Sequence, residues 1–396
     1  MSGIKYFPKD LNIKNKTILL RVDLNVPLKN KEIQDATRIS LILPFLNDLI
    51  KRKSKIIILT HLGRPKEGKD NDLSLMPIYK YLKKNINSNV YFFTGNIDEE
   101  TKTKSDYLKQ GEILLIENIR FFKEESSNDE RFAENLSKLA DIYINDAFSC
   151  SHRKQASLHK ITKFMKHSYA GPLLKKEVDA IDMVIKNKKK PVTCIIGGSK
   201  ISTKIEVISN LIKNVDNIAI VGAMANNFLA YDGLKVGKSL VEKNTEEVIK
   251  NIYQNSKKYN CNIIIPKDCY VSKSFDGVAE LRKTNSIAKD EIILDIGTDT
   301  IERIVKEIDK SNTVLWNGPA GYFENDNFNK GTNAIAEKIS ENTTNKSLIS
   351  ILGGGDTISA INKIKKDLSF THLSTAGGAF LEYLEGKDLP GISVLK

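Results

Sequence analysis

The sequence predicts an α/β protein made of two doubly wound, Rossmann-like parallel-sheet domains joined by a helix. Its 396 residues exceed what one hydrophobic core usually holds together. Short runs rich in isoleucine, leucine and valine alternate with amphipathic stretches along the chain, which is typical of buried parallel strands separated by helices. The runs fall into two sets, one on each side of a helical segment, and this arrangement predicts two domains.

The first set of predicted strands lies in the amino-terminal part of the chain, at residues 17–23, 55–61, 90–95, 113–118 and 141–148. The second set lies beyond the helical segment, at residues 192–198, 218–222, 262–266, 313–318 and 348–354. We therefore expect a first domain over residues 1–170 and a second domain over residues 191–379.

The segment between the two sets, residues 171–190, has the spacing of an amphipathic helix. Its apolar residues recur at helical spacing: Leu173, Leu174, Val178, Ile181, Val184 and Ile185. The pattern ends in a run of lysines followed by Pro191, which stops a helix. We interpret the segment as an interdomain helix beside a hinge.

Composition indicates a soluble protein of a reducing cytoplasm. No apolar run approaches the ~20 residues of a membrane-spanning helix, and the amino-terminal segment lacks the apolar core of a signal peptide. The cysteines form no CxxC pair and show no zinc-binding spacing, which favours a reducing compartment. They are Cys150, Cys194, Cys261 and Cys269.

The formal net charge of +12 is a feature shared with nucleic-acid-binding proteins, which we keep as an alternative. Aromatic residues make up only 7% of the chain, however, and the lysines are scattered. We therefore favour a basic site for anionic metabolites. Only nine of the 61 basic residues are arginine, so the arginines indicate positions that need a planar, forked donor.

One stretch, DGLKVGKSL at residues 232–240, ends like a phosphate-binding P-loop. A P-loop has four residues between its glycines and lies between a strand and a helix. Here only three residues separate Gly233 from Gly237, and the stretch follows a predicted helix at residues 223–232. We expect a surface loop that begins with a helix stop at Gly233.

Basic side chains follow the first set of predicted strands and can converge on one rim, because ligands of parallel sheets bind beyond the carboxyl ends of the strands. They are Arg21, Arg38, Arg64, Arg120 and Arg153, with His61 and His152. A single such arginine is usually a surface ion pair. Five together predict a clamp for a small anion that carries phosphate and carboxylate groups. Asp23 and Asn25 are placed to orient that anion through its hydroxyl groups.

Glycine-rich turns follow the second set of strands and predict a nucleotide-phosphate site, since glycine lets the backbone approach a phosphate. One turn, at residues 197–198, precedes Lys200 and Lys204, whose spacing places both on one helix face. Another turn leads into Asp356, a candidate ligand for Mg²⁺. The remaining candidates at these strand ends are Gly353, Gly354, Gly355, Thr357, Asn317, Glu324 and residues 374–378.

Together the two halves predict phosphoryl transfer between a small anion and a nucleotide, after a closing motion of the domains. No candidate general base is evident in the sequence. An acceptor carboxylate needs none because it is already deprotonated, so positioning and charge neutralisation are sufficient. A kinase for an alcohol acceptor would need such a base.

Several blocks of the sequence resemble the phosphoglycerate kinase family in order and spacing, over essentially the whole chain. These blocks are RVDLNVP, DATRI, HLGRP, LLIENIRF, NDAF with SHR, AGPLLKKE, GGSKISTKI, VLWNGPAGYFE, GGGDT and HLSTAGGAFLEYLEGKDLPG. The resemblance implies reversible transfer of a phosphoryl group from 1,3-bisphosphoglycerate to ADP, which gives 3-phosphoglycerate and MgATP in glycolysis and gluconeogenesis. It also implies a monomer without nucleic-acid or membrane partners, and a tail, residues 380–396, that packs back on the first domain.

The resemblance carries over residue by residue. The residues that match the phosphoglycerate site are Asp23, Asn25, Arg38, His61, Arg64, Arg120 and Arg153, while Arg21 and His152 match the surrounding basic patch. The residues that match the nucleotide site are Lys200, Lys204, Asn317, Glu324, Gly353, Gly354, Gly355, Asp356 and Thr357, with Asp356 as the match to the magnesium ligand. The resemblance implies direct catalytic roles for Arg38, Lys200, Lys204, Gly355 and Gly378, and places Gly377 at the same helix start.

The chain departs from the family's usual pattern at a few positions, none of which removes a charged group assigned to the transfer. The departures are at Ser149, Cys150 and Ser151, and at Gln155, Val221, Ala223, Ala376 and Phe380. An inactive scaffold of the same fold, the second alternative, would be expected to lack Arg38, Lys204 or Asp356. All three are present.

Overall fold

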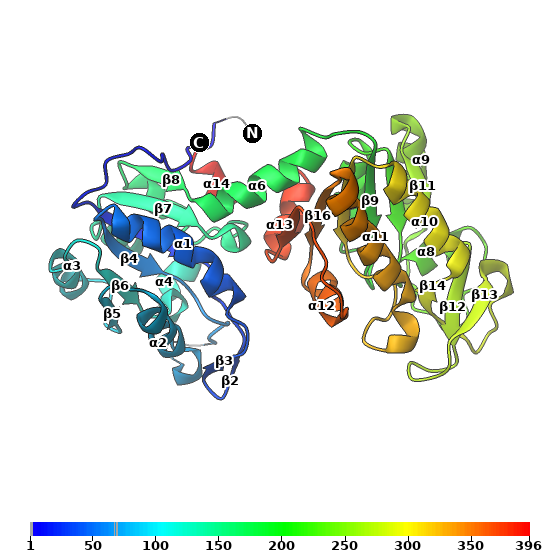
Figure 1. Cartoon of the computed structure of the whole chain (residues 1–396), viewed down its shortest axis with the longest axis horizontal. Coiled ribbons are helices and arrows are strands. Elements are labelled where there is room, and N and C mark those ends of the chain that lie inside the picture. The colour runs from blue at the N-terminus through cyan, green and yellow to red at the C-terminus, as the bar shows by residue number, and fades with distance from the viewer. Residues whose placement is uncertain (1–2, 67, 69) are drawn as a thin grey trace. The chain divides into compact units, whose positions relative to one another are not determined.

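The computed structural model of the chain describes residues 3–66, 68 and 70–396. The chain forms two compact units (Figure 1). Unit 1 contains Met1–Val178 together with Asp388–Lys396, and unit 2 contains Asp179–Lys387. The division falls inside helix α6 (Pro172–Ile185), which occupies the segment interpreted as an interdomain helix. Of the predicted tail, residues 380–387 stay with unit 2 and only residues 388–396 belong to unit 1.

Unit 1 is built on a parallel six-stranded sheet with the order β5-β6-β4-β1-β7-β8. Its strands are β1 (Thr17–Val22), β4 (Lys55–Leu59), β5 (Val90–Phe93), β6 (Ile113–Ile116), β7 (Ile142–Asp146) and β8 (Ser168–Ala170). The sequence predicted the first five. Strand β8 was missed because its three residues, Ser-Tyr-Ala, carry no apolar run.

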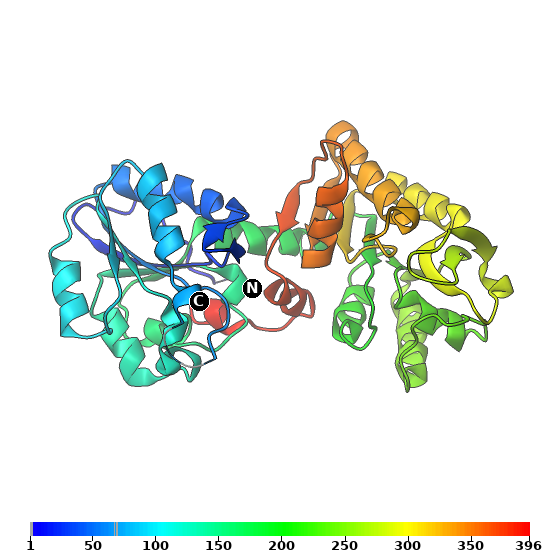
Figure 2. The ribbon, with the colours of Figure 1, turned by 90° about the horizontal axis from the view of Figure 1, so that it is seen from below.

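Helices cover both faces of this sheet, which is why its inner strands β1, β4 and β6 are mostly apolar. They are α1 (Thr37–Lys51), α2 (Met76–Asn85), α3 (Glu99–Asp106), α4 (Lys123–Ser126), α5 (Glu130–Ser137) and α14 (Pro390–Ser393). Helices α1 and α2 pack on one face through residues such as Leu46 and Leu82. Helices α4 and α5 lie on the other face (Figure 2).

Short elements complete unit 1 at the ends of its strands. They are the hairpin β2 (Leu28–Lys29) and β3 (Glu32–Ile33), and the 3-10 turns η1 (Asn71–Leu73), η2 (Ile119–Phe121), η3 (Phe148–Cys150) and η4 (Lys160–Lys163). The two ends of the chain meet beside β8, where the Lys5 N–H donates to the Leu395 carbonyl over 2.8 Å. Four residues before Leu395, the Gly391 carbonyl accepts from Asn145 Nδ2 at 2.9 Å. These contacts tie residues 388–396 to the end of β7.

Unit 2 repeats the plan with a second parallel six-stranded sheet in the order β11-β10-β9-β15-β16-β17. Its strands are β9 (Val192–Ile196), β10 (Asn217–Ile220), β11 (Asn262–Ile264), β15 (Thr313–Asn317), β16 (Ile349–Gly353) and β17 (His372–Ser374). The α/β class and the parallel sheets predicted from the sequence are thus confirmed. Strand β17 was not predicted.

The helices of unit 2 also lie on both sides of their sheet. They are α7 (Ile205–Ile212), α8 (Ala225–Tyr231), α9 (Glu246–Tyr259), α10 (Thr298–Lys310), α11 (Lys330–Lys346), α12 (Gly355–Lys363) and α13 (Gly378–Leu384), with 3-10 turns η5 (Thr284–Ser286) and η6 (Asp326–Phe328). Figure 2 shows α10 and α11 on one side and α7 and α9 on the other. The core beneath α10 and α11 centres on Trp316, which is fully buried.

A three-stranded antiparallel sheet extends unit 2, and the sequence interpretation missed it entirely. Its order is β13-β12-β14, with β12 (Asp268–Ser272), β13 (Glu280–Lys283) and β14 (Ile292–Ile296). Strand β13, Glu-Leu-Arg-Lys, is largely exposed and has no apolar run. A search for buried parallel strands between helices could not detect it.

Residues 237–239, the Gly-Lys-Ser sequence considered above as the end of a P-loop, form a turn that packs against β14. The Lys238 N–H donates to the Glu291 carbonyl at 2.7 Å, and Ser239 Oγ accepts from the Ile293 N–H at 2.8 Å. Gly237 has φ +60°, and a Cβ there would lie 2.2 Å from the Glu291 carbonyl oxygen. The rejection of a P-loop is confirmed, because these groups bind the backbone. Within the described part of the chain, no helix is long and apolar enough to cross a membrane.

Candidate functional site

In unit 1 the predicted polar residues gather where four parallel strands end. Asp23 and Asn25 follow β1, His61 follows β4 and Arg120 lies in η2 after β6. Ser149, which was not predicted as a site residue, joins them from η3 after β7. Since β1, β4, β6 and β7 are parallel, these ends share one edge of the sheet. Arg38 reaches the same edge from the first turn of α1. We call these residues, together with Arg64, Cys150, His152 and Arg153, the anion rim.

Asp23 is the centre of the rim. Its Oδ2 receives a hydrogen bond from Arg38 Nη1 at 2.7 Å and another from Ser149 Oγ, while its Oδ1 accepts the Asn25 N–H at 3.0 Å. Burial by itself raises the pKa of Asp23, but His61, Arg38 and these hydrogen bonds lower it below its ordinary value. Asp23 is therefore a carboxylate at neutral pH, and it holds Arg38 in place.

His61 is 3% exposed, and its Nδ1 lies 3.7 Å from the Sγ atom of Cys150. Burial lowers its pKa well below the ordinary histidine value, and the nearby arginine charges add to this although Asp23 opposes it. The imidazole is therefore neutral at neutral pH. It can offer an anion an N–H group but no full positive charge.

The remaining rim residues differ in exposure. Arg120 Nη1 donates to the Gly63 carbonyl at 2.6 Å, and Asn25 Oδ1 accepts the Gly63 N–H at 2.8 Å, so one loop is clamped from both sides. Burial lowers the pKa of Arg120, with Arg21 and Arg153 contributing in the same direction. Arg64 and Arg153 are exposed, and His152 is half-buried with a pKa lowered by burial and by Arg153.

Arg21 was predicted as part of a basic patch, but its side chain lies inside unit 1 with 0% exposure. Its Nε donates to Ser157 Oγ at 3.0 Å, and Ser157 Oγ in turn donates to Glu125 Oε1 at 2.6 Å. Burial raises the pKa of Glu125, and the Arg21 charge opposes that rise. Arg21 therefore acts on the rim through its electric field and not as a surface ligand. The sequence could not reveal that Arg21 is buried, because the residues of β1 on both sides of Arg21 are apolar.

In unit 2 three strand ends meet around one lysine. Lys204 Nζ donates to the carbonyl of Gly197 after β9 and to the carbonyl and Oδ1 of Asn317 at the end of β15, the latter two at 3.1 and 2.5 Å. Asn317 Nδ2 then donates to the Gly353 carbonyl, at the end of β16, over 2.7 Å. Asn317 is buried and links the strand ends, so its side chain positions Lys204.

The prediction that Lys200 and Lys204 share a helix face is wrong. Helix α7 begins only at Ile205, and Lys204 is its N-cap residue. The segment from Ile201 to Lys204 is a turn closed by a 2.8 Å hydrogen bond between the ends. Lys200 is exposed in the loop before this turn. Burial lowers the pKa of Lys204 to about 8, opposed by Asp356, and the oxygens around Nζ favour its charged form at neutral pH.

The turn after β16 leads directly into α12, as the glycine run predicted. Gly354 has φ +104°, and a Cβ on Gly353 would lie 2.5 Å from the ring of Phe380. Gly355 opens the helix with free space beside it, and Asp356 is exposed in the first turn. The Thr357 hydroxyl is buried and bonds to the backbone of Gly318 and Gly353, at 2.7 and 3.0 Å. Gly378 likewise begins α13, preceded by Gly377 at φ +55°.

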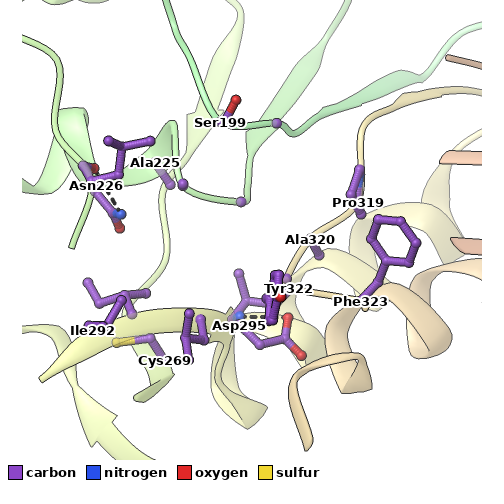
Figure 3. A pocket seen from close by; sticks show the side chains of 18 of the residues that line it. Ser199, Ala225, Asn226, Cys269, Ile292, Asp295, Pro319, Ala320, Tyr322 and Phe323 are labelled. Carbon is purple, nitrogen blue, oxygen red and sulfur yellow. Dashed lines mark hydrogen bonds between the residues drawn. The ribbon is translucent and has the colours of Figure 1, made fainter. Parts of the chain in front are cut away.

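A pocket of about 540 Å³ lies beside these strand ends (Figure 3). Ala225 and Asn226 form one side, Pro319 to Phe323 form another, and β14 with Cys269 forms the floor. A mostly apolar cavity with a few polar groups is typical of a site for a flat organic ligand. Of the predicted nucleotide residues, Glu324 and Asp356 line it, whereas Asn317 and Thr357 lie behind the strand ends.

Most of the pocket walls were missed by the sequence interpretation. They come from β14 and from the loop after β15, with Asp295 on the floor and Tyr322 above it. Asp295 accepts the Gly331 and Ile296 N–H groups, each at 2.9 Å, and burial raises its pKa to about 7. The one usable signal was the short apolar stretch at residues 292–296, which has the composition of a strand.

Comparisons with known proteins match the whole chain. The family model described as phosphoglycerate kinase matches residues 8–387. The chain is 43% identical to the phosphoglycerate kinase of Wolbachia pipientis wMel over 98% of both chains. It is 44% identical to that of Bradyrhizobium diazoefficiens over 98% of this chain and 97% of the relative.

Solved structures agree with these matches. The phosphoglycerate kinase of Coxiella burnetii superimposes with a TM-score of 0.91 at 37% identity, covering 98% of this chain and 97% of that one. The enzyme of Pyrococcus horikoshii OT3 superimposes with a TM-score of 0.80 at 29% identity, covering 98% of both chains. These relatives are enzymes, so they give no support to the nucleic-acid-binding alternative.

Proposed function

The chain belongs to the phosphoglycerate kinase family, and from this premise we propose that it transfers a phosphoryl group reversibly from 1,3-bisphosphoglycerate to ADP, giving 3-phosphoglycerate and ATP. The observation that carries the proposal is the pairing of two different sites in one chain. An arginine-rich anion rim ends the strands of unit 1, and a pocket beside a helix start ends those of unit 2. A transfer between a small anion and a nucleotide needs both.

The anion rim binds phosphoglycerate. Arg38, already oriented by Asp23, supplies a forked donor for the transferred group or for the acceptor carboxylate. Arg64, Arg120 and Arg153 neutralise phosphate charge, and the neutral His61 donates a hydrogen bond. Asp23 and Asn25 accept hydrogen bonds from the hydroxyl groups of the substrate. Arg21 and His152 strengthen the positive field around the rim.

The nucleotide binds in unit 2, with its base in the apolar pocket and its ribose near Glu324. The amides at Gly353, Gly354, Gly355 and Thr357 face the phosphates at the start of α12, where the helix dipole favours negative charge. Lys200 and Lys204 neutralise the phosphate chain. Asn317 contributes by holding Lys204 at the strand ends.

The nucleotide arrives with Mg²⁺, and Asp356 fits the role of its protein ligand. The carboxylate is exposed at the first turn of α12 and faces the pocket. Mg²⁺ in kinases is usually held by one or two carboxylates together with substrate phosphates and water. When bound, the ion would neutralise part of the negative charge of the nucleotide phosphates. The oxygen-only donor set at Asp356 suits this hard cation.

The chemistry needs no general base because the acceptor is a carboxylate. Arg38, Lys204 and the amides of Gly355 and Gly378 stabilise the charge on the phosphoryl group as it passes in line between the substrates. Closure of the two units would exclude water from this group. We propose a monomeric enzyme of the cytoplasm, in keeping with the four free cysteines.

A coupled assay tests the function. The chain is supplied with 3-phosphoglycerate and MgATP, and loss of NADH is followed through glyceraldehyde-phosphate dehydrogenase. We expect turnover of at least about 10 per second and a loss of about 10³-fold in kcat for Arg38→Ala. Arg131→Ala, which removes an exposed arginine of α5 in the same unit, is the matched control. Wild-type turnover that survives Arg38→Ala would contradict the proposed role of the rim.

A further inference from the structure

Three side chains of the anion rim form a mixed cluster of metal-binding groups. Each of Asp23, His61 and Cys150 offers one ligand atom, and these three atoms lie within 4.8 Å of one another. They come from three separate segments, after β1, after β4 and in η3. His61 and Cys150 are buried, and Asp23 is partly exposed. The cluster therefore has a sulfur, a nitrogen and an oxygen donor around one point, with an opening on the Asp23 side.

The spacing of these atoms suits a tetrahedral ion. Bonds of about 2.3 Å to sulfur and 2.0–2.1 Å to nitrogen place the two donors about 3.5 Å apart at a tetrahedral centre. The observed distance between Cys150 Sγ and His61 Nδ1 is 3.7 Å. The carboxylate of Asp23 must approach by about 1 Å, within the reach of a side-chain rotation. Within the described part of the chain, its Oδ1 accepts one hydrogen bond, from the Asn25 N–H, and so keeps a lone pair for a metal.

The donor set also selects the kind of ion. Thiolate and imidazole ligands favour Zn²⁺ and similar soft or borderline cations, whereas Mg²⁺ prefers oxygen ligands only. We propose that Asp23, His61 and Cys150 bind a divalent transition-metal ion, with Zn²⁺ as the type, and that the bound ion blocks the anion rim. On binding, the Cys150 thiol releases its proton to solvent and the thiolate joins a carboxylate and a neutral imidazole. The fourth position is left for water.

The charges around the cluster set its strength. Arg21, Arg38 and Arg120 all act electrostatically on His61, and they oppose the arrival of a dication. The two negative ligands balance the charge of the ion, but Arg38 must share Asp23 with it. We therefore expect weaker binding than at structural zinc sites. The occupancy of such a site changes with the free metal concentration, which reversible inhibition requires.

The binding step is tested with Co²⁺ as a spectroscopic stand-in for Zn²⁺, using the full chain. We expect near-ultraviolet absorption from a thiolate-to-cobalt transition, displaced by Zn²⁺ and absent in Cys150→Ser. The serine variant keeps a hydroxyl able to bond with His61. Cys261→Ser is the matched control, since Cys261 is also buried but lies in unit 2. Absorption that persists in Cys150→Ser, or that is lost in Cys261→Ser instead, overturns the site.

A second measurement uses only the wild-type chain, so its result does not depend on whether the serine variant folds. X-ray absorption of the Zn²⁺-loaded wild-type chain reports the ligand shell directly. We expect one sulfur at about 2.3 Å with nitrogen and oxygen at about 2.0–2.1 Å. A shell made only of oxygen and nitrogen atoms overturns the role of Cys150.

The blocking step rests on the proposed function and is tested separately. The acyl phosphate is trapped with hydroxylamine and ADP is measured by chromatography, because a coupling enzyme with its own thiol also responds to zinc. We expect the half-inhibitory free Zn²⁺ concentration to rise at least tenfold in Cys150→Ser and to stay unchanged in Cys261→Ser. Equal inhibition of all three chains overturns the block. A metal-free wild type without turnover contradicts the proposed function instead, and leaves the cobalt result to decide the binding.

Discussion

The anion rim of unit 1 and the pocket of unit 2 both lie at the carboxyl ends of the strands of a parallel sheet, but they are built from different kinds of residue. The rim consists of charged side chains already bonded to one another, as in the 2.7 Å contact between Arg38 and Asp23. The pocket consists of apolar walls and glycine-rich backbone, and among the described residues that line it the ionisable acids and bases are Asp356, Glu324, Lys238 and Asp295. A small anion offers little apolar surface, so it must be bound by charged side chains through ion pairs and hydrogen bonds. A nucleotide offers a flat base and a phosphate chain, which a cavity and a helix start can hold.

The difference also concerns preorganisation. In the rim, hydrogen bonds hold Arg38 through Asp23 and Arg120 through the Gly63 carbonyl before any substrate arrives, whereas Arg64 and Arg153 are exposed. In unit 2, Lys204 is held at the ends of β9 and β15 while Lys200 remains exposed. We infer that the rim tolerates geometric change poorly, whereas unit 2 depends more on space and on the charge of Lys204. The following predictions test this contrast.

The largest effect is expected from Arg38→Lys, which keeps the charge but removes the planar fork. We expect kcat to fall by about 10³-fold, because an ammonium group is a single nitrogen and lacks the planar fork with which a guanidinium bonds Asp23 and the Asn25 carbonyl and still grips an anion in two-point contact. The KM for the nucleotide should stay within twofold. Steady-state kinetics with both substrates varied measures this, and Arg131→Lys is the control. A fall of less than tenfold would mean that charge alone is sufficient in the rim.

The next effect concerns one buried aspartate in each unit, Asp146 at the end of β7 and Asp295 in β14. Burial raises the pKa of both to about 7. In the unfolded chain an aspartate loses its proton near pH 4, so between about pH 4 and pH 7 only the folded chain holds the proton. Each residue therefore costs stability as pH rises through this window, by at most about 4 kcal/mol.

Replacement by asparagine removes this cost in either unit. Relative to wild type, we expect Asp146→Asn and Asp295→Asn to become more stable on going from pH 5 to pH 7.5. Urea unfolding followed by fluorescence and circular dichroism measures the midpoints at both pH values. Asp72→Asn, at an exposed site, is the control. Midpoints that shift equally with pH in wild type and in both buried-site variants would show that these carboxyls ionise normally.

A smaller effect is expected from Gly353→Ala, which adds one methyl group behind the nucleotide turn. Its Cβ would lie 2.5 Å from the Phe380 ring, so β16 or α13 must shift. We expect a loss of about 1–3 kcal/mol in unfolding free energy and a higher KM for the nucleotide, with the KM for phosphoglycerate unchanged. Gly355→Ala, where the added atom meets no protein atom within 4 Å, is the matched control for stability. Equal losses of unfolding free energy in the two variants would contradict the packing argument.

The smallest effect is the pH dependence of nucleotide binding through Lys204. Burial lowers its pKa to about 8, so the free protein loses this positive charge as pH rises past that value. We expect the Kd for ADP to rise about tenfold between pH 7 and pH 9, which is the ratio of charged lysine at the two values. Calorimetric titration measures it. A wild-type Kd that stays constant, or one that rises equally in Lys204→Met, would remove Lys204 from phosphate binding.

All the parallel strands except β8 and β17, the glycine run before α12 and the arginines at strand ends were readable in the sequence. Each is a local pattern, because a strand buried on both faces must be apolar throughout and a tight turn needs glycine. The family also follows from contiguous blocks such as GGGDT. Two local interpretations failed. Lys200 and Lys204 do not share a helix, and β12, β13 and β14 went unnoticed.

What local patterns could not supply is the meeting of residues from distant segments. The burial of Arg21 depends on Ser157 and Glu125, more than a hundred residues further along the chain. The position of Lys204 depends on Asn317, and the cluster of Asp23, His61 and Cys150 depends on three separate loops. Sequence periodicity reports which face of an element is buried. The packing of whole units decides which partner each side chain contacts there. That partner in turn determines the charge and the position of the side chain.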